Sequence, residues 1–171
     1  MSREGERAPR PGPSPAGFAG ILGLFVAVGV AAGVAWEWQW TAPLGTVLDG
    51  VWRLDPSGLA EEFAGTGSYV LISAVVGLLT GALVGWRGDR FALGVLAAVL
   101  VGSLAAGFAM AATGSALGPE DPRTLAVDAA DATTLPADLR VNAVGAYAVL
   151  PAAATSGAVI VWWSVRPRRE T

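Results

Sequence analysis

The chain has 171 residues and a net charge of −3, and 53% of its residues are hydrophobic while only 15% are charged. Charged residues make up about a quarter of a typical soluble domain. The chain contains no Cys and no His, which excludes the usual zinc sites, disulfide frameworks, thiol nucleophiles and Ser-His-Asp triads. All eleven basic residues are Arg and lie dispersed along the chain, so no nucleic-acid partner is expected. The length allows one domain or a small helical bundle.

Four long stretches of the chain are apolar and contain no Asp, Glu or Arg. They cover residues 17–36, 68–86, 91–112 and 141–163. About 20 residues of α-helix cross the roughly 30 Å hydrocarbon core of a bilayer, and each stretch has about that length. Strands of a membrane barrel would alternate polar and apolar residues, and Leu93 to Val101 shows no such alternation. We therefore predict an all-α fold, a four-helix transmembrane bundle embedded in the lipid bilayer.

The positions of the Arg residues predict the orientation of these spans. Eight Arg lie in the first sixteen residues, in the turn at 87–90 or after residue 163, whereas the two long loops carry three Arg and ten carboxylates. Because basic residues near span ends stay in the cytoplasm, we expect both termini inside and a multi-pass location in the plasma membrane. Residues 1–16 combine charge, Pro, Ser and Gly and are predicted to be a disordered cytoplasmic tail, and residues 164–171 a second, short one. The first span is longer than the apolar region of a signal peptide, so we expect it to remain as an anchor.

Aromatic residues lie at both ends of the predicted spans, where amphipathic rings prefer the headgroup zone. The outer set is Trp36, Trp38, Trp40 and Tyr69, and the inner set is Trp86, Phe91, Trp162 and Trp163.

The first outer loop contains a signal for the start of a helix. Asp55 supplies a capping carboxylate and Pro56 suits the first helical position. Leu59 and Phe63 then lie four residues apart, on one face. We predict a short helix on the outer surface that leads into the second span, and we expect the preceding segment, 38–54, to fold back on the bilayer surface.

The second outer loop, 113–140, is acidic and contains three Pro residues. Pro119 and Pro122 flank a turn signal. We expect little regular structure in this loop beyond a helical turn or a short strand.

Small residues recur every four positions in three of the spans, and such spacing lets lipid-immersed helices approach closely. The candidates for helix packing are Gly29, Gly33, Gly77, Gly81, Gly85, Ser103 and Gly107. These stripes have two interpretations: packing within one bundle, or contact between chains in a homo-oligomer or with a partner.

The fourth span contains Pro151, which removes a backbone hydrogen bond and predicts a helix kink, with the Thr155 hydroxyl available to the freed carbonyl.

None of the spans holds an ionisable side chain. Proton-coupled carriers, pumps and voltage sensors place such groups at membrane depth, so ion-coupled transport is not expected. In the outer loop, Glu61 and Glu62 are adjacent and point about 100° apart on a helix, which does not suit an acid/base pair. We assign no catalytic, cofactor-binding or metal-binding residue.

The arrangement of these features resembles the actinobacterial four-span membrane proteins grouped as domain of unknown function DUF2567. The resemblance rests on a first span that runs into a Trp-rich end and Ala42-Pro43, on Glu62-Phe63 before a Gly-rich second span, and on Leu150-Pro151-Ala152-Ala153 in the fourth. It implies a membrane location and a four-span fold, and it carries over no activity and no catalytic residue.

The sequence therefore supports a non-enzymatic multi-pass membrane protein, an assembly or accessory component of the cell envelope that contacts a membrane or envelope protein. The expected contacts lie in the first outer loop and are Trp38, Trp40, Trp52, Leu59, Glu62 and Phe63. The alternative is a homo-oligomeric small-solute transporter or channel that associates through Gly77, Gly81 and Gly85. A membrane enzyme that uses Glu61 and Glu62 is a third, less favoured hypothesis.

Overall fold

The structure is a computed structural model that describes residues 15–87 and 92–165. The elements in chain order are α1 (Pro15–Gln39), β1 (Leu44–Leu48), β2 (Val51–Arg53), α2 (Pro56–Arg87), α3 (Ala92–Leu117), α4 (Pro122–Leu125), β3 (Thr134–Pro136), the 3₁₀ helix η2 (Val144–Ala148) and α5 (Val149–Val165). Four helical segments are long and apolar enough to cross a membrane. The predicted all-α, four-span fold is therefore confirmed, with a small sheet that the sequence analysis did not predict. Of the predicted tails, only residues 15–16 and 164–165 lie within the described part of the chain.

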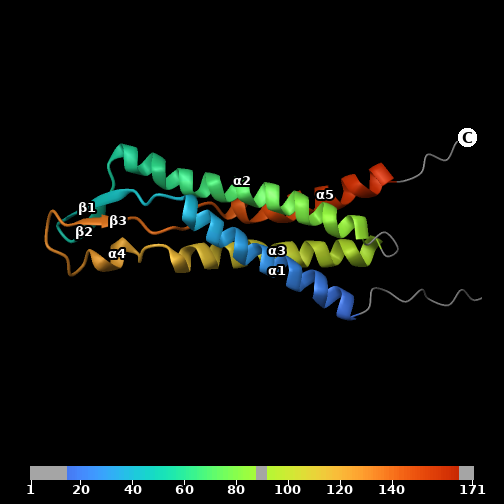
Figure 1. Cartoon of the computed structure of the whole chain (residues 1–171). Helices are drawn as coiled ribbons and strands as arrows, with labels where there is room; N and C mark the ends of the chain where they lie inside the picture. The colour runs from blue at the N-terminus through green and yellow to red at the C-terminus, as the bar shows by residue number, and fades with distance from the viewer. Residues whose placement is uncertain (1–14, 88–91, 166–171) are drawn as a thin grey trace, which may run out of the picture.

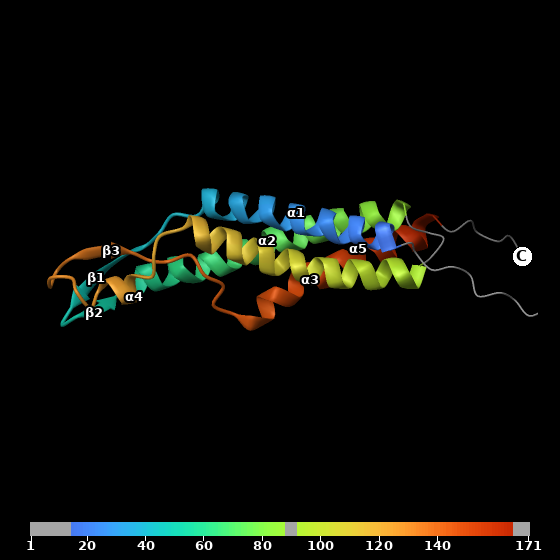
Figure 2. The ribbon, with the colours of Figure 1, turned by 90° about the horizontal axis from the view of Figure 1, so that it is seen from below.

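The four long helices lie side by side, and the sheet and α4 lie together at one end of the bundle (Figures 1 and 2). At the opposite end lie the start of α1, the end of α2, the start of α3 and the end of α5 (Figure 1). The small sheet, α4 and the segments that join them to the bundle, residues 40–54 and 118–143, are called the cap below.

The bundle is built from two closely packed helix pairs, α2 with α5 and α1 with α3. Gly77, Gly81 and Gly85 all face α5, and a Cβ atom on any of the three would lie within 3 Å of α5 backbone atoms. At Gly81 the obstructing atom is the carbonyl oxygen of Ala154. The Gly stripe of α2 thus packs within the chain, because α5 covers it. Of the two interpretations of the small-residue stripes, this contact favours packing within one bundle.

The second pair uses the same kind of contact. Gly29 of α1 lies against the backbone of Ala106, and Gly33 lies against the carbonyl oxygen of Met110. Ser103 is fully buried in α3, where its hydroxyl donates to the carbonyl oxygen of Leu100, 3.0 Å away. The backbones of both helix pairs are therefore in direct contact. Since lipid provides no hydrophobic effect to bring helices together, van der Waals packing at these contacts stabilises the pairs.

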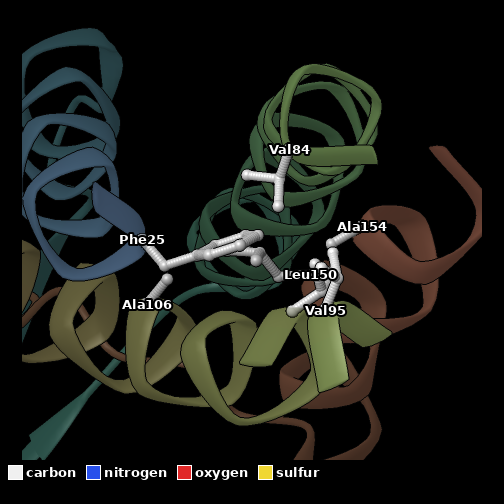
Figure 3. Close-up of a cluster of buried hydrophobic side chains, with 7 residues drawn as sticks. Phe25, Val84, Val95, Ala106, Leu150 and Ala154 are labelled. Atoms are coloured by element: carbon white, nitrogen blue, oxygen red, sulfur yellow. The ribbon is translucent and has the colours of Figure 1, made fainter. Parts of the chain in front are cut away.

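A cluster of buried apolar side chains joins the two pairs in the half of the bundle far from the cap. Figure 3 shows Phe25 of α1 reaching across to Val84 of α2, beside Val95 and Ala106 of α3. Gly102 makes room for the Phe25 ring, since a Cβ there would lie 2.9 Å from a ring carbon. Sequence analysis did not select Gly102, although small residues recur every four positions there, at Gly94, Ala98, Gly102 and Ala106.

A second cluster fills the half of the bundle near the cap, and it corrects part of the predicted aromatic belt. Trp36 and Tyr69 are fully buried and meet edge to face, with ring centroids 5.2 Å apart. The indole N–H of Trp36 donates to the carbonyl oxygen of Gly65 at 2.8 Å, and the Tyr69 hydroxyl donates to that of Gly107 at 2.9 Å. These two rings therefore do not face headgroups; they satisfy backbone carbonyls inside the bundle.

The other predicted belt residues differ in burial, and Trp40 is half-buried. The rings of Trp38, Trp86 and Trp163 are largely exposed. Trp162 is half-buried, and its indole N–H donates to the carbonyl oxygen of Gly85 at 2.9 Å. Phe91 lies outside the described residues.

Helix α2 has 32 residues, which is about 48 Å of helix. The short helix predicted after Asp55 forms, but it is continuous with the second span and makes up the first turns of α2. The Gly58 N–H donates to the Asp55 carboxylate at 2.7 Å and so begins the helix as the sequence indicated. Because α2 is longer than the bilayer core, its first turns project beyond the membrane and support the cap.

Helix α5 is short, with 17 residues, and begins at Val149 after the 3₁₀ helix η2. Pro151 therefore lies in its first turn, where the missing N–H leaves no hydrogen bond unmade. The kink predicted at Pro151 is therefore wrong. The irregularity in this span is the change from 3₁₀ helix to α-helix, which lies before Pro151.

The close contact of α2 and α5 yields the first prediction. Replacing Gly81 with Ala should lower the free energy of unfolding by about 1–3 kcal/mol, because the new methyl group has to push α5 away. The matched control is Gly67→Ala, also in α2, where a Cβ meets nothing within 4 Å. Unfolding by denaturing detergent, followed by circular dichroism, measures both. Equal free energies of unfolding for the two variants would contradict a close contact between Gly81 and α5.

A candidate interaction site on the cap

The cap contains a three-stranded antiparallel sheet with the strand order β2-β1-β3. Leu48 pairs with Val51 across a two-residue turn whose residues, Asp49 and Gly50, both have positive φ. An Asp-Gly pair between apolar residues is a strong signal for this type of hairpin turn. The sequence analysis overlooked it, and its expectation that 38–54 folds back on the bilayer surface is wrong.

Both outer loops contribute to this sheet. The Val47 N–H donates to the carbonyl oxygen of Thr133, and the Ala132 N–H donates to that of Val47, both at 2.9 Å. The Asp49 N–H donates to the Asp131 carboxylate at 2.9 Å. The second loop thus contains, as expected, a helical turn and a short strand, and these join the first loop in one folded unit.

The inner face of the sheet packs on the second loop. Val47 and Trp52 form a buried cluster with Ala126 and Ala137. The indole N–H of Trp52 donates to the carbonyl oxygen of Leu135 at 3.1 Å. Trp52 is only 8% exposed, so it belongs to the core of the cap, and its predicted role as a surface contact is corrected.

A second predicted contact residue, Trp40, lies between the cap and the bundle. Its side chain packs against the buried cluster of the cap and also against the cluster that contains Trp36 and Tyr69. The cap is therefore in apolar contact with the end of the bundle.

Four charged side chains pair at the base of the cap. Arg140 contacts the Asp138 carboxylate with Nε at 2.6 Å and with an Nη at 2.8 Å, and this hydrogen bonding raises the pKa of Arg140. Arg123 lies 3.7 Å from both Asp121 and Asp138. Pairing of this kind satisfies the carboxylates with Arg. Among the described residues no group of three His, Cys, Asp or Glu could hold a metal ion.

The predicted contact residues on α2 differ in their surroundings. Glu62 accepts a hydrogen bond from the side-chain amide of Asn142 at 3.3 Å, which ties α2 to the segment before η2. Leu59 and Phe63 are exposed, as is Trp38 at the end of α1. Of the six predicted contacts, five therefore reach the surface at least in part, all but Trp52, and they form no reactive group.

The outer face of the sheet carries exposed apolar residues that the sequence analysis missed. Leu44 is 65% exposed, Leu48 47% and Val51 51%. We call this surface the outer sheet face, and it also includes Thr46 and Arg53, which pair across the two strands. Exposed and buried positions alternate along β1, but its sequence, Leu-Gly-Thr-Val-Leu, shows no matching alternation of apolar and polar residues and so gives no signal for this face.

With the second span placed at its predicted bounds, 68–86, the outer sheet face lies well outside the bilayer. Ser68, the predicted outer end of the second span, is 12 residues from Pro56, which corresponds to about 18 Å of helix. The headgroup region adds only about 5–7 Å to each side of the hydrocarbon core. Apolar side chains on the cap therefore face water, whereas those on the spans face lipid.

Comparison of the chain with models of known families, with curated proteins and with solved structures gives no match. The class of protein thus follows from the fold alone: four apolar helices of spanning length make a multi-pass helical membrane protein, and the outer loops fold into a cap.

The cap at the start of α2 yields a prediction on pH dependence. Hydrogen bonds from the Gly58 N–H and then the Ser57 hydroxyl lower the pKa of Asp55. Their stabilising effect is complete above the unfolded pKa of about 3.9 and is lost as the pH falls through the lower folded value. As the pH falls from about 4 to 2, the rate of amide hydrogen exchange in the first turn of α2 should therefore rise more in the native chain than in Asp55→Asn. The Asn side chain still offers a capping oxygen but does not titrate. Identical pH profiles would contradict this assignment.

The paired charges yield another prediction. Asp138→Asn should raise the rate of trypsin cleavage after Arg123 about fivefold, because loss of the shared carboxylate costs about 1 kcal/mol in this partly exposed setting and opening of the cap becomes more frequent. Asp128→Asn, at an exposed position in the same loop, is the matched control and should cleave like the native chain. If both variants cleave alike, the charge cluster does not stabilise the cap.

Proposed function

We propose that this protein is a non-enzymatic accessory or assembly component of the cell envelope, located in the plasma membrane with both termini inside. Its cap, on the outer side, binds a membrane or envelope protein through the outer sheet face. The resemblance to the DUF2567 group belongs to this proposal and adds no activity to it.

The observation that carries the proposal is the position of Leu44, Leu48 and Val51. They are about half exposed or more and lie on one face of a small sheet. This sheet belongs to the cap, which faces water when the second span has its predicted bounds. Burying each against a partner would gain about 1 kcal/mol. Grouped apolar residues on a water-facing surface are typical of an interaction site.

The charges of the cap favour binding over catalysis. Asp121, Asp138 and Glu62 are held by Arg or Asn side chains. The outer side carries ten carboxylates against three Arg in the sequence, a net charge of −7 by difference. A partner with an apolar centre and a basic rim would complement this surface.

The experiment compares two tagged full-length chains in cells. Leu48→Asp combined with Val51→Asp places charges on the outer sheet face without changing a buried side chain. Crosslinking, mild detergent extraction and mass spectrometry should recover a membrane or envelope protein in stoichiometric amount with the native chain, and at least tenfold less of it with the variant.

The matched control is Val127→Asp, which changes an exposed apolar residue of the cap outside the sheet. It should retain the partner. Equal recovery from the native chain and from the sheet variant would refute the proposed surface, and recovery of this chain alone would refute assembly with another protein.

A further inference from the structure

A groove of about 470 Å³ lies between α1 and α2 at the end of the bundle far from the cap. From α1 it is lined by Gly20, Ile21 and Leu24, among others, and from α2 by Leu83 and Val84. Its volume falls in the range of about 300–1,000 Å³ that is usual for ligand sites. Figure 1 shows α1 separating from α2 toward this end.

The groove is apolar along its length and charged at one end. Arg87, the last residue of α2, lines it and lies beside Trp86, with the guanidinium carbon 5.8 Å from the centre of the indole ring. Cationic and aromatic residues together at the end of a span are typical of the headgroup level. The groove therefore runs from this level into the hydrocarbon region.

The base of the groove is formed by closely packed side chains. Val84 is 6% exposed and belongs to the same buried cluster as Phe25, with Ile21 packed against that cluster. A Cβ on Gly20, in contrast, would meet nothing within 4 Å. Among residues 15–87 and 92–165, no atom beyond the adjoining turn of α1 lies within 4 Å of the position that a Cβ on Gly20 would take, and the surrounding solvent at this depth is lipid.

We propose that this groove binds one anionic phospholipid of the inner leaflet, with an acyl chain along α1 and α2 and the phosphate at Arg87. Hydrocarbon matches the apolar lining, and a guanidinium matches a phosphate in both charge and geometry. The inference goes beyond the proposed function and takes from it only the orientation that places this end of the bundle at the inner leaflet.

The test uses the purified full-length chain in mild detergent, so it does not depend on any protein partner. Native mass spectrometry follows titration with phosphatidylglycerol and with phosphatidylcholine of the same acyl chains. The native chain should bind one phosphatidylglycerol at least fivefold more tightly than phosphatidylcholine. Arg87→Gln should lose about fivefold in affinity for phosphatidylglycerol, as expected for one Arg near an anionic headgroup, and less for phosphatidylcholine, because its choline group offsets the charge of its phosphate.

A second variant tests the acyl-chain contact separately. Gly20→Leu places a side chain in the groove and should weaken binding of both lipids about tenfold. Gly23→Leu is the matched control: it lies on the same helix, meets nothing within 4 Å and does not line the groove, so it should bind like the native chain.

Three results would overturn the proposal. One is equal affinity of the native chain for the two lipids, which removes the role of Arg87. Another is unchanged binding by Gly20→Leu, which places the lipid elsewhere on the surface. The third is a dimer of the native chain that Gly20→Leu abolishes, which makes a second copy the occupant of the groove.

Discussion

Contact between helix backbones at small residues is the constraint on which this structure depends. Apolar side chains gain little by leaving lipid for the interior of a bundle, so the helices must find attraction in close packing. Gly81 against Ala154 and Gly29 against Ala106 provide that contact in the two helix pairs. The larger apolar side chains that join the pairs, Phe25 above all, then fill the remaining space.

The position of the cap depends indirectly on this packing, because the packed helices support it. Helix α2 is long enough to carry its first turns beyond the membrane, and Asp55 fixes where it begins. Trp36 holds α1 to α2 at the outer level through the carbonyl oxygen of Gly65, and Trp40 continues the apolar contact into the cap. Because both outer loops share one sheet, they present a single surface of defined shape, which two separate loops would not.

The two candidate binding surfaces lie at opposite ends of the molecule and differ in chemistry. The outer sheet face is apolar within an acidic, water-facing unit, which suits a protein partner. The groove between α1 and α2 is apolar with an Arg at its end, which suits a lipid. The predicted spans between them contain no Asp, Glu or Arg, so no series of charged side chains connects the two surfaces.

Much of the bundle could be predicted from the sequence, because span length, apolar runs and small-residue spacing are local properties. The four spans, the start of α2 at Asp55 and the small-residue stripes all follow from such patterns. Whether the stripes pack within or between chains could not, since that depends on which helix covers Gly81. Likewise, Trp36 and Tyr69 have the composition of a headgroup belt, yet they are buried because carbonyls of neighbouring helices lie within hydrogen-bond distance.

The candidate site was less accessible to sequence reasoning. An Asp-Gly turn could have revealed the hairpin, but nothing in the sequence of β1, Leu-Gly-Thr-Val-Leu, marks Leu44 and Leu48 as exposed. No local pattern could have shown that β3, about ninety residues further along, completes the sheet and buries Trp52. The groove has no sequence signal either, because it exists only where α1 separates from α2. Sequence alone thus determined the membrane class and the spans, through properties of single segments. Tertiary structure decided the surfaces available for binding, because each is formed or left open by segments distant in the chain.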